Sequence, residues 1–173
     1  MRTRNLVAGV AVLVALVALG VTAAAQSKPA TAQGKPATAG KDAWAGTWKL
    51  NVAKSMYTPG PAPKSSTVVI SATDGGISQT VDTVPATGAA QHWMVTAKFD
   101  GKDVPVKGNP NADMMAFKKT GDRSYQIISK KDGKTTTTAI VTISADGKTR
   151  TNRQTGVTAD GKPAKNMLVY ERQ

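Results

Sequence analysis

The stretch that decides the fold is "KDGKTTTTAIVTISADGKT", residues 131 to 149. It places an Asp-Gly-Lys turn on either side of a run rich in β-branched residues. Glycine accepts the positive φ that tight hairpin turns require, and β-branched residues favour strands. Within the run, Ala139, Val141 and Ile143 share one face and alternate with Ile140 on the other. This period of two predicts a strand with one buried face.

Similar turns recur along the chain, as "TDGGI", "FDGKD", "TGDRS" and "ADGKP". The segments between them predict about ten strands. Their expected bounds are 46–52, 66–73, 76–83, 90–99, 103–107, 113–119, 124–130, 135–144, 148–156 and 164–172. Because closure removes exposed sheet edges, so long a meander predicts an all-β, antiparallel up-and-down β-barrel of about 8–10 strands. Closure would pair the first strand with the last.

Both ends of this predicted barrel carry a motif. "AGTWKL" occupies residues 45 to 50, and "LVYERQ" occupies residues 168 to 173. These ends resemble the fatty-acid-binding protein family, within the calycin group that includes the lipocalins, and "DGKTTTT" at 132 to 138 resembles the segment before its eighth strand. The chain also resembles secreted bacterial lipocalin-like domains. The resemblance implies a barrel that binds a small apolar or amphipathic molecule, such as a lipid.

The matched ends have a structural interpretation. Trp48 shares a face with Gly46 and Leu50, so we expect it to plug one end of the barrel. Arg172, on the neighbouring strand, would lie over the Trp48 ring as a cation–π pair. The alternative is that Trp48 contacts a ligand.

The resemblance fails where the related family holds a fatty-acid carboxylate. Tyr170 is present, but Leu168 occupies the position of one clamp arginine, and the other falls near Ala139 or Ile140. Because a buried carboxylate without a cation is costly, the arginine clamp cannot be carried over. We therefore expect a neutral ligand to be favoured over a long-chain fatty acid.

A second departure concerns the family's two lid helices. The corresponding segment here, residues 52 to 66, contains Pro59, Pro61 and Pro63, which exclude a helical pair. Either the mouth of the barrel is open, or an irregular flap carrying Met56 and Tyr57 covers it.

Candidate ligand-binding residues are the large side chains of the alternating segments, although sequence alone does not decide which face points inward. They are Trp93, Val95, Tyr125, Ile127, Leu168 and Tyr170. Three methionines, Met94, Met114 and Met115, suit either an adaptable pocket or ordinary core packing.

The N-terminal region predicts export. Arg2 and Arg4 precede an apolar run from Leu6 to Leu19, and small residues follow, which is typical of a secretory signal peptide at 1–25. A retained membrane anchor is the alternative. Residues 26–42 contain "KPATA" twice, and their composition predicts a solvated linker. Residues 43–173 then form the predicted barrel domain. We expect a secreted or periplasmic protein whose mature form has no membrane span.

The net charge of +12 drops to about +7 or +8 once the signal peptide and linker are set aside. The basic residues neither cluster along a helix nor interleave with aromatics, so nucleic-acid binding is not expected. Weak contact with anionic envelope polymers is more consistent with this charge. An alternative function is therefore a non-enzymatic accessory module with a filled barrel, which contacts such polymers or a protein partner through its basic surface.

The sequence offers little for catalysis. It has no cysteine and one histidine, His92, which we expect on the surface rather than in a ligand contact or as a catalytic base. Nearly all the acids lie in turns, and no group resembles a metal site. "GNPNAD" at 108 to 113 is better explained by turns than as a cation loop. We expect no enzyme activity, catalytic residue, metal or cofactor; an enzyme of undetected type is the third option.

Overall fold

The computed structural model describes residues 43–158 and 161–173. The predicted signal peptide (1–25) and linker (26–42) lie outside the described residues. The described part contains ten strands and one short 3-10 helix, η1 (Val52–Lys54). The strands are β1 (Gly46–Leu50), β2 (Ser65–Thr73), β3 (Gly76–Val84), β4 (Gln91–Lys98), β5 (Asp100–Pro105), β6 (Met114–Gly121), β7 (Ser124–Lys131), β8 (Lys134–Ile143), β9 (Thr149–Val157) and β10 (Pro163–Arg172).

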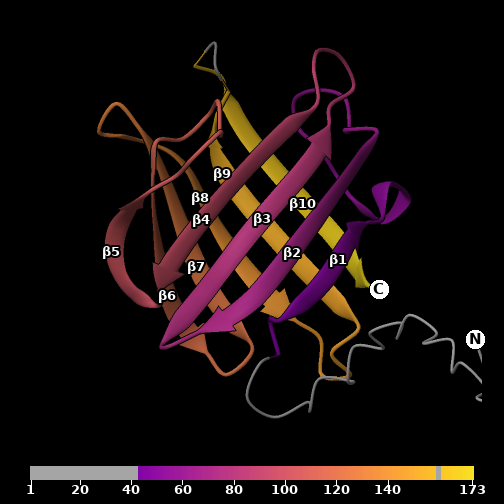
Figure 1. Cartoon of the computed structure of the whole chain (residues 1–173). Helices are drawn as coiled ribbons and strands as arrows, with labels where there is room; N and C mark the ends of the chain where they lie inside the picture. Colours follow the sequence, from indigo (N-terminus) through magenta and orange to yellow (C-terminus); the bar gives the residue numbers. More distant parts are fainter. Residues whose placement is uncertain (1–42, 159–160) are drawn as a thin grey trace, which may run out of the picture. The chain divides into compact units, whose positions relative to one another are not determined.

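The strands form one antiparallel sheet in the order β4-β3-β2-β1-β10-β9-β8-β7-β6-β5, rolled into a barrel (Figure 1). Within the described chain, β1 and β10 are the only sheet neighbours that are not consecutive in sequence. The predicted all-β up-and-down barrel is confirmed, and its first and last strands pair as expected.

One predicted hairpin is wrong. The "FDGKD" turn does not pair the strands on either side of it, since β4 and β5 are the two edges of the sheet. The chain bends at Phe99 so that β5 pairs with β6 instead. The Phe99 ring turns inward, with its centroid 5.7 Å from the ring of Trp44 and 5.2 Å from that of Tyr125. The partly buried ring thus packs against the core at the point where the chain bends.

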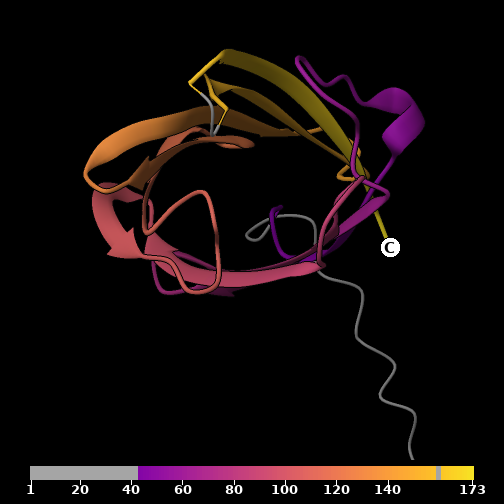
Figure 2. The same cartoon turned by 90° about the horizontal axis from the view of Figure 1, so that it is seen from above.

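The gap between β4 and β5 is closed by a single bridge after β5. Met94 N donates to Lys107 O at 3.0 Å, and Lys107 N donates to Met94 O at 3.1 Å. Gly108 follows with a φ of +81°, and a side chain there would collide with the His92 carbonyl. Glycine thus lets the loop approach β4 closely. The strands make a ring when viewed along the barrel (Figure 2).

The seam between β1 and β10 holds the two chain ends together. Trp48 pairs with Arg172, whose guanidinium carbon lies 4.2 Å from the centroid of the fully buried Trp48 ring. This geometry agrees with the predicted cation–π pair. Arg172 also donates hydrogen bonds from Nη2 to Ala43 O at 2.7 Å and from Nη1 to Ala45 O at 2.5 Å.

The segment after η1 lengthens this seam. Met56 and Met167 exchange backbone hydrogen bonds of 2.8 and 2.9 Å, and Lys165 N donates to Thr58 O at 2.7 Å. As expected, this segment contains no pair of lid helices. Of the two predicted alternatives, an open mouth or a covering flap, the segment does not form the flap, because it runs beside β10. Figure 2 shows η1 outside the ring of strands. Met56 is exposed, whereas Tyr57 packs against the core.

The two ends of the barrel interior differ. One end is filled by aromatic rings: Trp44 lies edge-on to Tyr125 at 5.1 Å, and Phe117 stacks on Tyr125 at 6.1 Å. Trp48 and Ile143 are buried in the same core. The other end is lined with more polar side chains and contains a cavity.

Candidate ligand-binding cavity

The polar interior begins with β9. Arg150, Asn152 and Gln154 alternate along this strand, and the first two are buried. In the β9–β10 ladder, Arg150 stands opposite Tyr170, and Asn152 opposite Leu168. Opposed residues of an antiparallel pair share a face of the sheet. The inward direction of Tyr170 and Leu168 therefore places the β9 residues inside the barrel.

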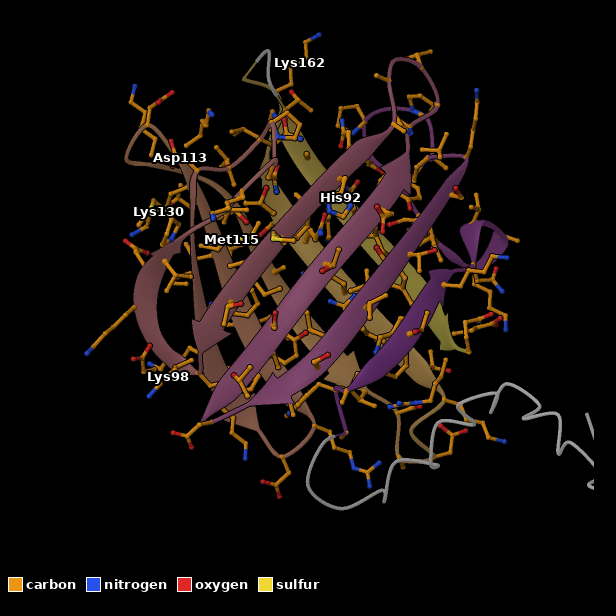
Figure 3. The ribbon with its side chains drawn as sticks, in the orientation of Figure 1. His92, Lys98, Asp113, Met115, Lys130 and Lys162 are labelled. Atoms are coloured by element: carbon orange, nitrogen blue, oxygen red, sulfur yellow. The ribbon has the colours of Figure 1, made fainter. Side chains whose placement is uncertain are left out.

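A cavity of about 210 Å³ lies against this polar column. Its apolar wall includes Val81, Trp93, Met115, Ile127, Ala139 and Tyr170. Its polar wall includes Gln79, Arg150, Asn152 and Gln154. Figure 3 shows Met115 inside the barrel, behind the front strands. The cavity thus offers an apolar surface and a set of hydrogen-bonding groups to one small molecule.

A wider hollow of about 870 Å³ adjoins the cavity. The two share Asn111, Thr136, Thr137 and Gln154, so the hollow borders the cavity. Lys131 and Lys134 also line it, at the β7–β8 turn.

Arg150 is the only charged side chain that lines the cavity in the described part of the protein, and it is 1% exposed. Its Nη2 lies 3.5 Å from the Tyr125 hydroxyl, a long hydrogen bond. The guanidinium carbon is 5.1 Å from the centroid of the Tyr170 ring. Its Nε and Nη1 make no hydrogen bond to any described residue.

Other buried polar atoms beside this cavity also have no hydrogen bond within the described residues. They are Oε1 of Gln79 and Oδ1 of Asn152. Buried polar groups are nearly always hydrogen-bonded, because leaving them unpaired is costly. Several such atoms gather around this one cavity, where water or another polar molecule would pair with them.

The predicted ligand-binding residues divide into two groups. Trp93, Ile127 and Tyr170 line the cavity. Val95, Tyr125 and Leu168 also face inward, but they are buried in the core and are not among the cavity-lining residues. A contact between any of these side chains and a ligand stays a prediction.

The interior contains a cation, although not at the positions of the fatty-acid clamp. At the compared clamp positions, Leu168 and Ala139 face inward and Ile140 faces outward, so those positions are apolar as the sequence shows. The cation comes from Arg150 on β9, a strand that the comparison of clamp residues did not consider. The expected preference for neutral ligands stays a prediction, and the position of Arg150 is a reason to test it.

Among the methionines, Met115 lines the cavity, whereas Met94 is 45% exposed on the outer face of β4. The loop before β6 makes the predicted turn, with Asn111 N donating to Asn109 Oδ1 at 2.8 Å. Both asparagines also line the cavity, which the sequence did not indicate.

His92 lies on the outer surface, but it does have a carboxylate partner, which its sequence neighbours did not reveal. Its Nδ1 is 2.6 Å from Oδ1 of Asp82 across the β3–β4 ladder, and both side chains are more than half exposed (Figure 3). In the described residues, no group of three or more His, Cys, Asp or Glu side chains could hold a metal ion. Nor does any described helix have the length and apolarity to cross a membrane.

The ten antiparallel strands and the β1–β10 closure form an up-and-down barrel, the fold that the resemblance of the chain ends implies. Among solved structures, the chain is similar to zebrafish ileal bile acid-binding protein complexed with cholic acid, at 11% identity and a TM-score of 0.45. The match covers 76% of this chain and 99% of that one. No protein-family model matches the chain, and no curated protein matches it significantly.

Proposed function

We propose that the barrel binds a small amphipathic molecule in its interior cavity. The observation that carries the proposal is the cavity itself, whose wall combines Trp93, Ile127 and Tyr170 with buried polar side chains. Ligand sites in proteins typically pair a largely apolar wall with a few orienting polar groups. The His92–Asp82 pair lies on the outer surface, away from the cavity, and has no role in this binding. The proposed function is therefore that of a binding protein rather than an enzyme.

The size of the cavity argues for a compact ligand. At about 210 Å³ it is smaller than common ligand pockets, which start at roughly 300 Å³. A ligand held wholly within this cavity must therefore be compact, and a purely apolar molecule would leave the polar wall without partners.

The test is calorimetric titration with cyclohexylmethanol, a neutral amphipathic probe. Ala139→Phe should fill the cavity, because Ala139 is a buried part of its wall. Ile140→Phe is the matched control, since Ile140 is 40% exposed on the outer face of the same strand. We expect the wild type and the control to bind alike, and the filled variant to bind about tenfold more weakly or not at all. Equal binding by all three proteins would refute an interior site.

The accessory-module alternative is supported by the aromatic end of the barrel, which is filled by Trp44, Phe117 and Tyr125. It would contact anionic envelope polymers through surface lysines. Absence of probe binding by the wild type, together with salt-sensitive retention on an anionic polysaccharide, would favour it over the ligand-binding proposal.

Export is a further part of the proposal. It rests on Arg2, Arg4 and the apolar run after them, which favour cleavage after Ala25. N-terminal sequencing of the protein from its own host should find Gln26 first; finding Met1 on membrane-bound protein would contradict export by this route.

A further inference from the structure

We propose that Arg150 is an anion receptor inside the barrel, and that the ligand is a compact hydroxylated carboxylic acid bound as its carboxylate. The proposal rests on the interior site proposed above and specifies its ligand. It starts from the buried guanidinium of Arg150 beside the cavity.

The charge of Arg150 has no counterion in the described part of the protein. None of the ion pairs there includes it, and no aspartate or glutamate lines the cavity. Arginine stays protonated in proteins, so it cannot relieve burial by losing its proton. A buried charge without a partner is strongly unfavourable. A bound anion would remove this penalty.

The contacts of Arg150 leave most of its hydrogen-bonding capacity for a ligand. The Tyr125 hydroxyl takes one long bond from Nη2, and the Tyr170 ring lies against the guanidinium. Nε and Nη1, which together carry three hydrogens, have no partner among the described residues. Carboxylate oxygens make short, charge-assisted bonds with such donors. Because Arg150 is 1% exposed, an anion must reach it from within the cavity.

The neighbouring amides select the rest of the ligand. Gln79 and Asn152 border the same cavity, and each has a buried amide oxygen without a hydrogen bond to a described residue. A hydroxyl group can donate to an amide oxygen and accept from an amide nitrogen. A hydroxylated acid would therefore satisfy both side chains, whereas an alkyl chain would bury them unpaired.

The outer hollow favours the approach of an anion. Lys131 and Lys134 line it, and Asn111 and Gln154 border both the hollow and the cavity. Positive charge along an entry route raises the local concentration of anions.

The test compares three probes of similar size on the wild-type protein by calorimetry. Glucuronate carries the acid and the hydroxyls, glucuronamide replaces the acid by a neutral amide, and cyclohexanecarboxylate lacks the hydroxyls. We expect glucuronate to bind about tenfold or more tightly than either of the others. Equal affinity for glucuronate and glucuronamide would overturn the anion receptor, and tighter binding of cyclohexanecarboxylate would overturn the hydroxylated ligand.

Variants then locate the receptor. Arg150→Met should reduce the preference for glucuronate over glucuronamide to about threefold or less. Arg153→Met, on the same strand but exposed on the outer face, removes the same charge and should keep the preference. An equal loss in both variants would point to general surface charge and overturn the assignment to Arg150. Circular dichroism checks that each variant is folded. If Arg150→Met does not fold, the comparison of the three probes on the wild-type protein still tests the proposed ligand.

The two proposals fail differently. Binding of cyclohexylmethanol without binding of glucuronate would leave the interior site standing and refute the anion receptor. If neither probe binds, the interior site itself fails.

Discussion

Arg172 is the side chain whose loss should most weaken the closing seam of the barrel. Its three nitrogens donate to three backbone carbonyls, of Ala43, Ala45 and Gly147, at 2.7, 2.5 and 2.7 Å. The guanidinium also covers the ring of Trp48. A hydrogen bond to a charged group contributes about 1.5–3 kcal/mol, and a cation–π contact about 1–2 kcal/mol. The full sum overestimates the effect, because the freed carbonyls lie near the surface and would regain water.

We therefore expect Arg172→Met to lower the free energy of unfolding by about 3 kcal/mol. Methionine keeps the apolar stem but not the donors. Arg172→Lys, which keeps the charge without the planar fork, should lose about 2 kcal/mol. Arg153→Met is the control, since that arginine is exposed on β9 and stands opposite Met167 rather than Arg172; it should change stability by less than about 0.5 kcal/mol.

The assay is urea denaturation followed by circular dichroism, with the free energy extrapolated to water. A double-mutant cycle with Trp48→Leu isolates the ring contact, and we expect a coupling of about 1 kcal/mol. A loss below about 1 kcal/mol for Arg172→Met would refute the reasoning that these contacts hold the two chain ends together.

Three further results are expected. Gly46→Ala should lower the free energy of unfolding by about 1–3 kcal/mol and with it the urea midpoint. The reason is that φ is +133° and the new Cβ would lie 2.5 Å from Nη1 of Arg172. An unchanged midpoint would contradict this. Hydrogen bonding by Lys54 lowers the pKa of Glu171 below its ordinary 4.5. The contribution of the ionised Glu171 to the stability of the fold is therefore present above that pH and lost on acidification. Glu171→Gln should show a smaller fall in urea midpoint between neutral and acidic pH than the wild type. Burial raises the pKa of Tyr57 to about 12, so an ultraviolet tyrosinate titration should lose its step near pH 12 in Tyr57→Phe, and persistence of that step would assign it elsewhere.

Most of the fold follows from local signals. Turn glycines such as Gly133 and Gly147 mark the hairpins, and alternation as in Ala139 and Val141 marks the strands; both depend on neighbours within a few residues. The exception is the turn at Phe99, which has hairpin chemistry but separates the two sheet edges. At that bend the Phe99 ring packs against Trp44 and Tyr125, which are distant in sequence, so a local pattern does not reveal these contacts.

The site is less predictable. Trp93, Ile127 and Tyr170 stand out because each is a large side chain on an apolar face. Arg150 does not, because "TRTNRQT" at 149 to 155 is polar on both faces and alternation cannot say which one is buried. One signal was present: a strand between two others with apolar inner faces must turn one of its polar faces inward. The β9–β10 register, which opposes Arg150 to Tyr170, settles which face it is.

The break between β4 and β5 has a consequence for chain connectivity. The two edges of the sheet, β4 and β5, are joined by a turn in the middle of the described chain. The first and last strands instead pair at the seam, where Gln173 N donates to Thr47 O at 3.0 Å. A circular permutant of residues 43–173 with joined ends and a new start at Asp100 would run β5 to β10 and then β1 to β4, so that every ladder would link consecutive strands. Its contact order would be lower, and such chains fold faster. In the natural order, by contrast, β1–β4 and β5–β10 are joined into one sheet only when the last strand, β10, pairs with the first.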